Sequence, residues 1–133
     1  MKYLCLGYLD EALWDSLPEP EGNAIMDRCF AYQDELERTG HYAGGELLQA
    51  PRNAATLRFR DGAVTVTDGP FAETKEQIGG FLLIEARDLN EAIQLVSRHP
   101  GVRVGPWEIR PVEDFGEAIR ASEARRGKAG NLR

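Results

Sequence analysis

Cysteine and histidine are scarce in this chain of 133 residues, which contains two of each. The histidines are not spaced by one helical turn, so the sequence contains no recognisable metal-binding motif. Cys5 and Cys29 both have apolar neighbours, which indicates reduced thiols in the core and not a disulfide. The glycine pair at 79–80 lies within a strand pattern, unlike the glycines of a phosphate-binding loop. We therefore expect no cofactor.

The sequence also lacks long apolar runs and an excess of positive charge. The longest apolar run covers residues 78–84, whereas a membrane-spanning helix needs about 20 residues. The first residues lack the length and cleavage site of a signal peptide, so we expect a cytoplasmic protein. Sixteen basic and 22 acidic residues give a net charge of −6. This charge disfavours nucleic acid and anionic membranes as partners.

Hydrophobic residues make up 42% of the chain and charged residues 29%, which is typical of a globular protein. A chain of this length buries enough surface for one core. We expect one domain over residues 1–115. A C-terminal tail over 116–133 is expected to begin as a short helix and to fray over residues 125–130.

The hydrophobic pattern alternates between strand and helix periods along the chain. It predicts strands at 2–9, 42–49, 55–60, 63–67, 78–86 and 102–112, and helices at 21–39 and 88–99. This order corresponds to an α+β fold, a ferredoxin-like βαβ-βαβ arrangement with an inserted β-hairpin. Two helices cover only one face of such a sheet. Because residues 2–9 and 78–86 are apolar on both strand faces, we expect a homodimer with the two sheets packed face to face.

The inserted hairpin is the most strongly determined local structure. Asp61-Gly62 predicts a two-residue type I′ turn between two alternating strands. The resulting cross-strand pairs are Phe59 with Val64, Leu57 with Val66, and Ala55 with Asp68. This register places Asp68 at the rim of the apolar hairpin face.

The segment Asp68–Phe81, with the sequence DGPFAETKEQIGGF, resembles the signature of the DGPF-motif branch of the YCII-related family. Residues 2–6 and 107–112 are also similar to that family. The resemblance implies a dimeric α+β barrel built from ferredoxin-like subunits. It implies little about activity, because most relatives are of unknown function. Some members suggest elimination or lactone-type chemistry on small organic acids, and this branch is associated with extracytoplasmic-function sigma factors.

The sequence departs from that family at two positions. Simpler members pair a histidine near the start of the first helix with an aspartate just before a proline at the end of the second helix. Here residues 19–30 contain no histidine, and His99 precedes Pro100. No catalytic residue is therefore transferred from the family at these positions.

Asp68 is the strongest candidate for a general base, because an apolar surrounding raises the proton affinity of a carboxylate. The alternative is structural, with Asp68 accepting N–H bonds from Phe71 or Ala72 in the Gly-Pro turn. His41 is the preferred acid-base partner and His99 the other choice. Each histidine follows a helix, so either could instead be a C-terminal cap.

Four further side chains are candidates for substrate binding. Glu73 and Lys75 lie on a predicted loop that could close over a cleft beside Asp68, and Lys75 could hold a substrate carboxylate. Glu108 and Arg110 share one face of the last strand, where the arginine could bind a carboxylate. The alternatives are a solvated charged loop and a structural ion pair.

Two hypotheses for function remain open at this point. One is a small-molecule pocket protein that acts as a cofactor-independent lyase or isomerase on a small carboxylate-bearing acid. The other is a non-enzymatic regulatory or ligand-binding module associated with an extracytoplasmic-function sigma factor.

Overall fold

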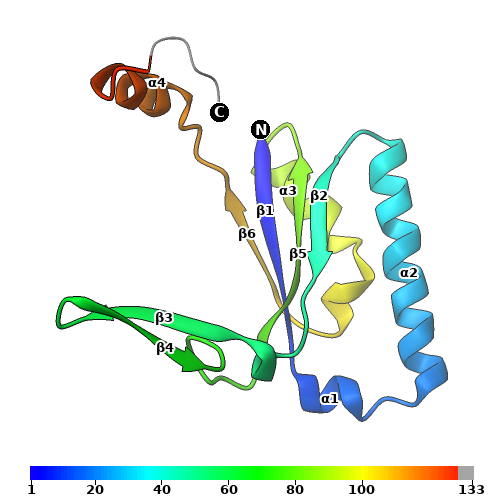
Figure 1. Ribbon diagram of the computed structural model, residues 1–133. Helices are drawn as coiled ribbons and strands as arrows, with labels where there is room; N and C mark the ends of the chain where they lie inside the picture. The colour runs from blue at the N-terminus through cyan, green and yellow to red at the C-terminus, as the bar shows by residue number, and fades with distance from the viewer. Residues whose placement is uncertain (129–133) are drawn as a thin grey trace.

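The computed structural model describes residues 1–128 and contains two antiparallel sheets (Figure 1). The central sheet has four strands in the order β2-β5-β1-β6. Its strands are β1 (Lys2–Leu9), β2 (Tyr42–Leu47), β5 (Gln77–Glu85) and β6 (Trp107–Pro111). The second sheet is a hairpin of β3 (Ala55–Arg60) and β4 (Ala63–Asp68), which projects away from the body. This is the predicted ferredoxin-like arrangement with its inserted hairpin.

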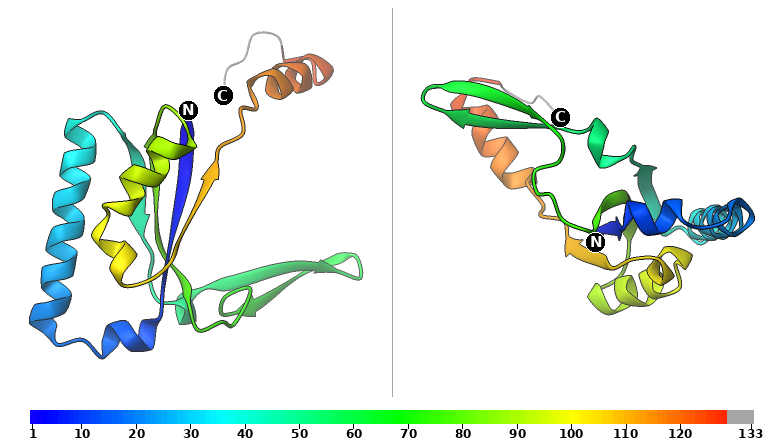
Figure 2. Two further views of the ribbon diagram at one scale, coloured as in Figure 1. Left: turned by 180° about the vertical axis from the view of Figure 1, so that it is seen from behind. Right: turned by 90° about the horizontal axis from the view of Figure 1, so that it is seen from below.

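Helices α2 and α3 cover one face of the central sheet (Figure 2). The helices are α1 (Glu11–Asp15), α2 (Glu19–Arg38), α3 (Leu89–Ser97) and α4 (Gly116–Arg125), with 3₁₀ turns η1 (Pro51–Asn53) and η2 (Pro100–Arg103). The Asp88 side chain caps α3 by accepting from the Glu91 N–H at 2.9 Å. Glu91 in turn accepts from the Arg87 N–H at 2.8 Å, which is a capping box displaced by one residue.

The hairpin register is confirmed in every predicted pair, including Ala55 with Asp68. Asp61 and Gly62 have positive φ angles of 52° and 79°, as a type I′ turn requires. The predicted start of the last strand is wrong, because η2 occupies residues 100–103 and β6 begins only at Trp107. Helix α1 lies in a segment that was expected to be a loop. Helix α4 continues to Arg125, and part of the segment expected to fray, residues 129–130, lies outside the described residues.

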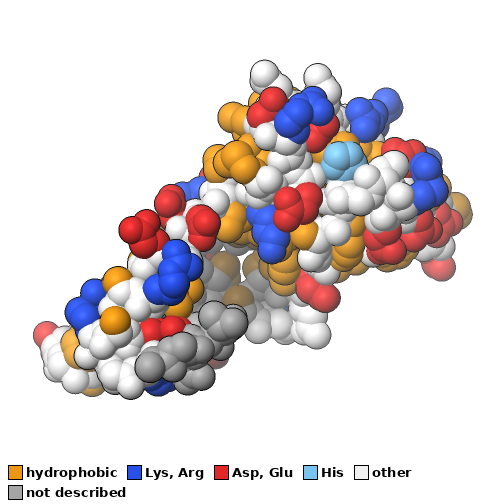
Figure 3. All heavy atoms as spheres, turned by 90° about the horizontal axis from the view of Figure 1, so that it is seen from above, with side chains coloured by type: hydrophobic (Ala, Val, Ile, Leu, Met, Phe, Trp, Pro, Cys, Tyr) orange, Lys and Arg blue, Asp and Glu red, His pale blue; other side chains and the backbone are white. Residues whose placement is uncertain are grey.

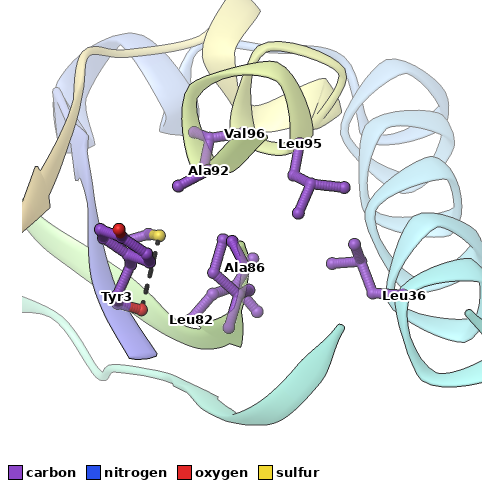
Figure 4. Close-up of a cluster of buried hydrophobic side chains, with 9 residues drawn as sticks. Tyr3, Leu36, Leu82, Ala86, Ala92, Leu95 and Val96 are labelled. Carbon is purple, nitrogen blue, oxygen red and sulfur yellow. Dashed lines mark hydrogen bonds between the residues drawn. The ribbon is translucent and has the colours of Figure 1, made fainter. Parts of the chain in front are cut away.

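The core lies between the central sheet and helices α2 and α3 (Figure 4). Its buried residues are Tyr3, Cys5, Leu36, Leu82, Ile84, Ala86, Ala92, Leu95 and Val96. The sheet members alternate along β1 and β5, so they share one face, which we call the covered face. Each large apolar side chain buried here stabilises the fold by about 1.5–3 kcal/mol.

The opposite face of the sheet has no helix over it. Its central residues are Leu4, Leu6, Phe81 and Leu83, which pair across β1 and β5 and are only half-buried. We call this the open face. The hairpin and α4 both project on this side of the sheet (Figures 1 and 2). None of the helices formed by residues 1–128 is both long enough and apolar enough to cross a membrane.

Candidate functional site

A cavity lies between α2, η2 and the covered face. Its volume is about 540 Å³, within the usual range for small-molecule sites. The residues that shape it include Gly7, Gly80, Cys29, Phe30, His99 and Trp107. We call it the central cavity. Its described lining contains one acidic residue, Glu46, and no lysine or arginine.

Two glycines on neighbouring strands line this cavity and form what we call its glycine floor. Gly7 of β1 pairs with Gly80 of β5. A Cβ atom on Gly7 would lie 2.8 Å from Cζ2 of Trp107, closer than any real contact. A Cβ on Gly80 would lie 3.0 Å from the backbone oxygen of Glu46. Neighbouring groups therefore already lie close beside both glycines, the Trp107 indole at Gly7 and the Glu46 backbone at Gly80.

His99 provides the one imidazole at the cavity wall. Its Nδ1 accepts a hydrogen bond from the Gly101 N–H at 2.9 Å, and its ring contacts Trp107 at 4.7 Å and Tyr32 at 5.8 Å between centroids. Burial lowers the pKa of His99 below its ordinary value of 6.5, so the ring is neutral at pH 7. Because Nδ1 is the acceptor, the proton of the neutral ring lies on Nε2.

The two cysteines occupy different environments. Cys5 is fully buried in the core, and burial raises the pKa of its thiol to about 11. Cys29 is half-buried at the cavity wall, and burial raises the pKa of its thiol as well. Both thiols are free, as expected. Cys29, however, faces the cavity and is not part of the core.

A second hollow of about 360 Å³ lies at the junction of β1, β6 and the loop before β5. It brings together two predicted binding residues, Lys75 and Glu108. The Tyr8 hydroxyl donates to Oε1 of Glu108 at 3.1 Å, and this bond raises the pKa of Tyr8. Nε of Arg110 lies 3.9 Å from Oε2 of Glu108, and Nζ of Lys75 lies 3.9 Å from Oδ2 of Asp10. We call this the outer hollow.

The expected pairing of Asp68 with His41 does not form within the subunit. His41 contacts the backbone oxygen of Glu85 through Nδ1 at 2.9 Å, at one end of β5. Asp68 leads into the loop at the other end of this nine-residue strand, roughly 25 Å away. The reason is topological, because β2 runs from the end of α2 toward the hairpin, so the two lie at opposite ends of the strands (Figure 1).

Asp68 is exposed and lines neither cavity, and its neighbour in the loop, Glu73, is exposed as well. In the part of the chain that the structure describes, Asp68 accepts no hydrogen bond from Phe71 or Ala72. The turn is held instead by the Gly69 N–H, which donates to the Ala54 carbonyl at 2.7 Å. The roles of Asp68 and Glu73 in catalysis and binding stay predictions.

Sequence reasoning did not identify the central cavity. The Gly7–Gly80 pair and Trp107 come together only through strand pairing, and His99 was the second choice of histidine. One signal was present, since His99 occupies the position before a proline where simpler relatives carry an aspartate. Among residues 1–128, no cluster of three potential metal ligands forms.

The fold and this cavity define the class of protein, an α+β subunit of ferredoxin-like type with a cavity on its helix-covered sheet face. A family model described as the YCII-related domain matches residues 1–116. The chain therefore belongs to the YCII-related family. Its assignment to the DGPF branch stays a prediction.

Two comparisons with individual proteins agree with this assignment. An uncharacterized protein of Rhizobium meliloti (strain 1021) is 36% identical over 116 residues, covering 84% of this chain and 92% of the relative. Among solved structures, the chain is similar to 5-chloro-2-hydroxyhydroquinone dehydrochlorinase from Burkholderia phenoliruptrix AC1100 in complex with 2,5-dihydroxybenzoquinone. The TM-score is 0.52 at 16% identity, covering 89% of this chain and 98% of the other. This likeness shows the shared fold.

Proposed function

We propose that the protein binds a small cyclic organic molecule in the central cavity and acts on it without a cofactor, as a lyase or an isomerase. The observation that carries this proposal is the cavity itself, with its glycine floor and its neutral imidazole. The Trp107 indole at the cavity wall suits a flat ring, which can stack against it. The dehydrochlorinase of the same fold was solved with a ring compound, which supports a ligand of this size.

His99 is the residue we propose to act on the ligand. Its Nδ1 is held by the Gly101 N–H, so Nε2–H remains as a donor toward a ligand oxygen. When the carbon next to a carbonyl gives its proton to a water molecule, the electron pair of that C–H bond moves toward the carbonyl oxygen. A fixed N–H donor stabilises the negative charge that develops there, and a neutral imidazole is suited to this role.

The lining of the central cavity favours a neutral or phenolic ligand over a carboxylic acid. The two cations expected to hold a carboxylate, Lys75 and Arg110, lie at or beside the outer hollow. Both are mostly exposed and both already face carboxylates of this chain. A carboxylate ligand anchored by Lys75, with Glu108 beside it, is therefore a second proposal, confined to the outer hollow.

We also propose that the protein forms a homodimer through the open face. Leu4, Leu6, Phe81 and Leu83 give this face an apolar centre that no helix covers. The association with an extracytoplasmic-function sigma factor stays an alternative, in which the chain regulates a partner instead of converting a ligand.

A thermal-shift screen tests ligand binding. The probes are hydroquinone, catechol, benzoquinone, cyclohexanone and benzoate, because a compound that binds the native state raises the melting temperature. The variant Met26→Trp fills the cavity from α2, and Asp27→Asn on the exposed side of that helix is its matched control. We expect one or more ring compounds to stabilise the wild type and the control but not Met26→Trp. Equal shifts in all three proteins, or none in the wild type, would contradict the proposal.

The chemical step is tested separately, by proton–deuterium exchange of a bound ketone in D₂O. His99→Asn removes the imidazole, and its side-chain oxygen is able to accept the Gly101 N–H and keep the cap of η2. We expect the wild type to accelerate exchange and His99→Asn to lose at least tenfold of that acceleration while still binding the ketone. Unchanged exchange in the variant would remove His99 from the mechanism.

A further inference from the structure

The hairpin β3–β4 carries a cluster of large apolar side chains that are exposed to solvent. Leu57, Phe59, Val64 and Val66 are 59–73% exposed. The register pairs Phe59 with Val64 and Leu57 with Val66, so all four lie on one face. We call this the hairpin face. The other face carries threonines and arginines, as alternation requires.

This arrangement is unfavourable for a hairpin that stands alone. An isolated two-stranded hairpin is marginally stable in water, and it gains stability when an apolar face packs against another surface. All six residues of β4 are exposed, and no described element covers the hairpin face. By contrast, Leu4, Leu6, Phe81 and Leu83 on the open face are half-buried by their neighbours. The apolar side chains of the hairpin face are therefore more exposed to solvent than those of the open face.

The size of the hairpin face matches what a symmetric dimer needs. It exposes roughly 500 Å² of apolar surface, near the upper end of what monomers tolerate. In a two-fold interface the same patch is buried twice, which gives about 1,000 Å² before its contacts are counted and reaches the range of specific interfaces.

The chain also carries a surface for this hairpin face to meet. The hairpin projects from one end of the sheet and α4 from the other, both on the side of the open face (Figures 1 and 2). Seen from above, the surface is hollowed between the main body and the projecting part, and hydrophobic side chains are visible there (Figure 3). Two further exposed apolar side chains, Val112 and Phe115, belong to the segment between β6 and α4.

We infer that the β3–β4 hairpin is a dimerisation arm whose hairpin face packs on a second copy of this chain. The inference rests on the proposed homodimer and goes beyond it, because it adds the arm to the open face as a second contact between the two copies. In a two-fold dimer, each copy packs its own arm on the partner and is in turn contacted by the arm of the partner.

Sedimentation velocity over about 1 to 100 µM gives the dimer dissociation constant. The wild type is expected to sediment at twice 14.8 kDa. The test variant is Phe59→Ser combined with Val64→Thr, and the matched control, Arg60→Gln with Thr67→Ser, changes only the polar face. We expect the test variant to weaken dimerisation at least tenfold and the control to leave it unchanged. A wild type that is monomeric, or a test variant that dimerises like the wild type, would overturn the inference.

A shortened hairpin covers the case in which the substitutions disturb folding. Replacing residues 59–64 by Asn-Gly joins Arg58 to Thr65, which already face each other, so the remaining register is kept. We expect a monomer with the far-ultraviolet circular dichroism of a folded α+β protein. A shortened protein that dimerises with the wild-type constant would contradict the arm.

Photo-crosslinking identifies what the hairpin face touches. A benzophenone side chain at position 59 is expected to crosslink to a second copy, whereas one at position 60 is expected not to. A crosslink at position 59 that maps only within its own chain would also overturn the inference. The open-face variant Leu6→Ser with Phe81→Ser separates the two proposals. If this variant lost the dimer while the hairpin variants kept it, the result would support the sheet interface without the arm. The thermal-shift screen on these same variants reports the cavity independently.

Discussion

The two faces of the central sheet differ in how completely the chain covers them. On the covered face, Tyr3, Cys5, Leu82 and Ile84 are at most 7% exposed beneath α2 and α3. On the open face, their neighbours along the same strands are half-buried and have no helix over them. The sequence of β1 and β5 is apolar at both sets of positions. The comparison shows that apolar alternation alone does not tell which face a subunit covers itself and which it leaves for another surface.

The core and the hairpin also differ in how far the chain covers their apolar side chains. Replacing leucine by alanine at one position in each region tests this difference. Leu36 is 2% exposed and Leu57 is 64% exposed. Leu36→Ala should lower the free energy of unfolding by about 2–5 kcal/mol through lost burial and a cavity. Leu57→Ala should change it by less than about 0.5 kcal/mol in dilute solution, and by more as the concentration rises.

Chemical denaturation at two protein concentrations measures both effects. A large loss for Leu57→Ala that does not depend on concentration would mean that the hairpin packs on its own subunit.

The glycine floor distinguishes the cavity from the packed core around it. Gly7→Ala places a methyl group against the Trp107 ring and should cost about 1–3 kcal/mol of stability, with a change in tryptophan fluorescence. Gly79→Ala meets Leu9 at 3.4 Å, an ordinary contact, and is the control. If both variants had wild-type stability and fluorescence, Trp107 would not lie where the structure places it.

His99 should make stability depend on pH in a defined direction. Its pKa is lowered in the folded protein, so the unfolded chain takes up a proton at this residue first as the pH falls. The contribution of His99 to the free energy of unfolding is therefore complete above its ordinary pKa of 6.5. It is lost as the pH falls from 6.5 toward the lower pKa of the folded protein. Subtracting the pH profile of His99→Asn isolates this contribution from the carboxylates. A difference profile that is flat below pH 6.5 would show that His99 is not buried.

Asp68→Asn should have the smallest effect on stability, less than about 0.5 kcal/mol, because the side chain is exposed and does not hold the turn. A loss of 1–2 kcal/mol would restore the structural interpretation of Asp68. A variant of full stability that no longer accelerates exchange of a ligand proton would support its predicted role as a base.

The sequence determined the features that depend on neighbouring residues. The type I′ turn at Asp61-Gly62 fixes the hairpin register, because two positive φ angles in succession leave one way to pair the flanking strands. The order of strand and helix periods was enough to predict the ferredoxin-like fold. The start of β6 could not be predicted, since His99 and Gly101 form a cap whose hydrogen bond does not show in the pattern of apolar residues.

Only the tertiary structure decided which residues form the site. Gly7 and Gly80 are far in sequence from each other, and Gly7 is far from the segment that carries His99 and Trp107; they meet because β5 and β6 both pair with β1. The length of β2 and β5 keeps His41 away from Asp68, because the two residues lie at opposite ends of these strands. A local pattern records which face a side chain occupies, but the distance between two side chains on different strands depends on strand order and register. Those are set by the packing of the whole sheet against its helices, and no single segment contains them.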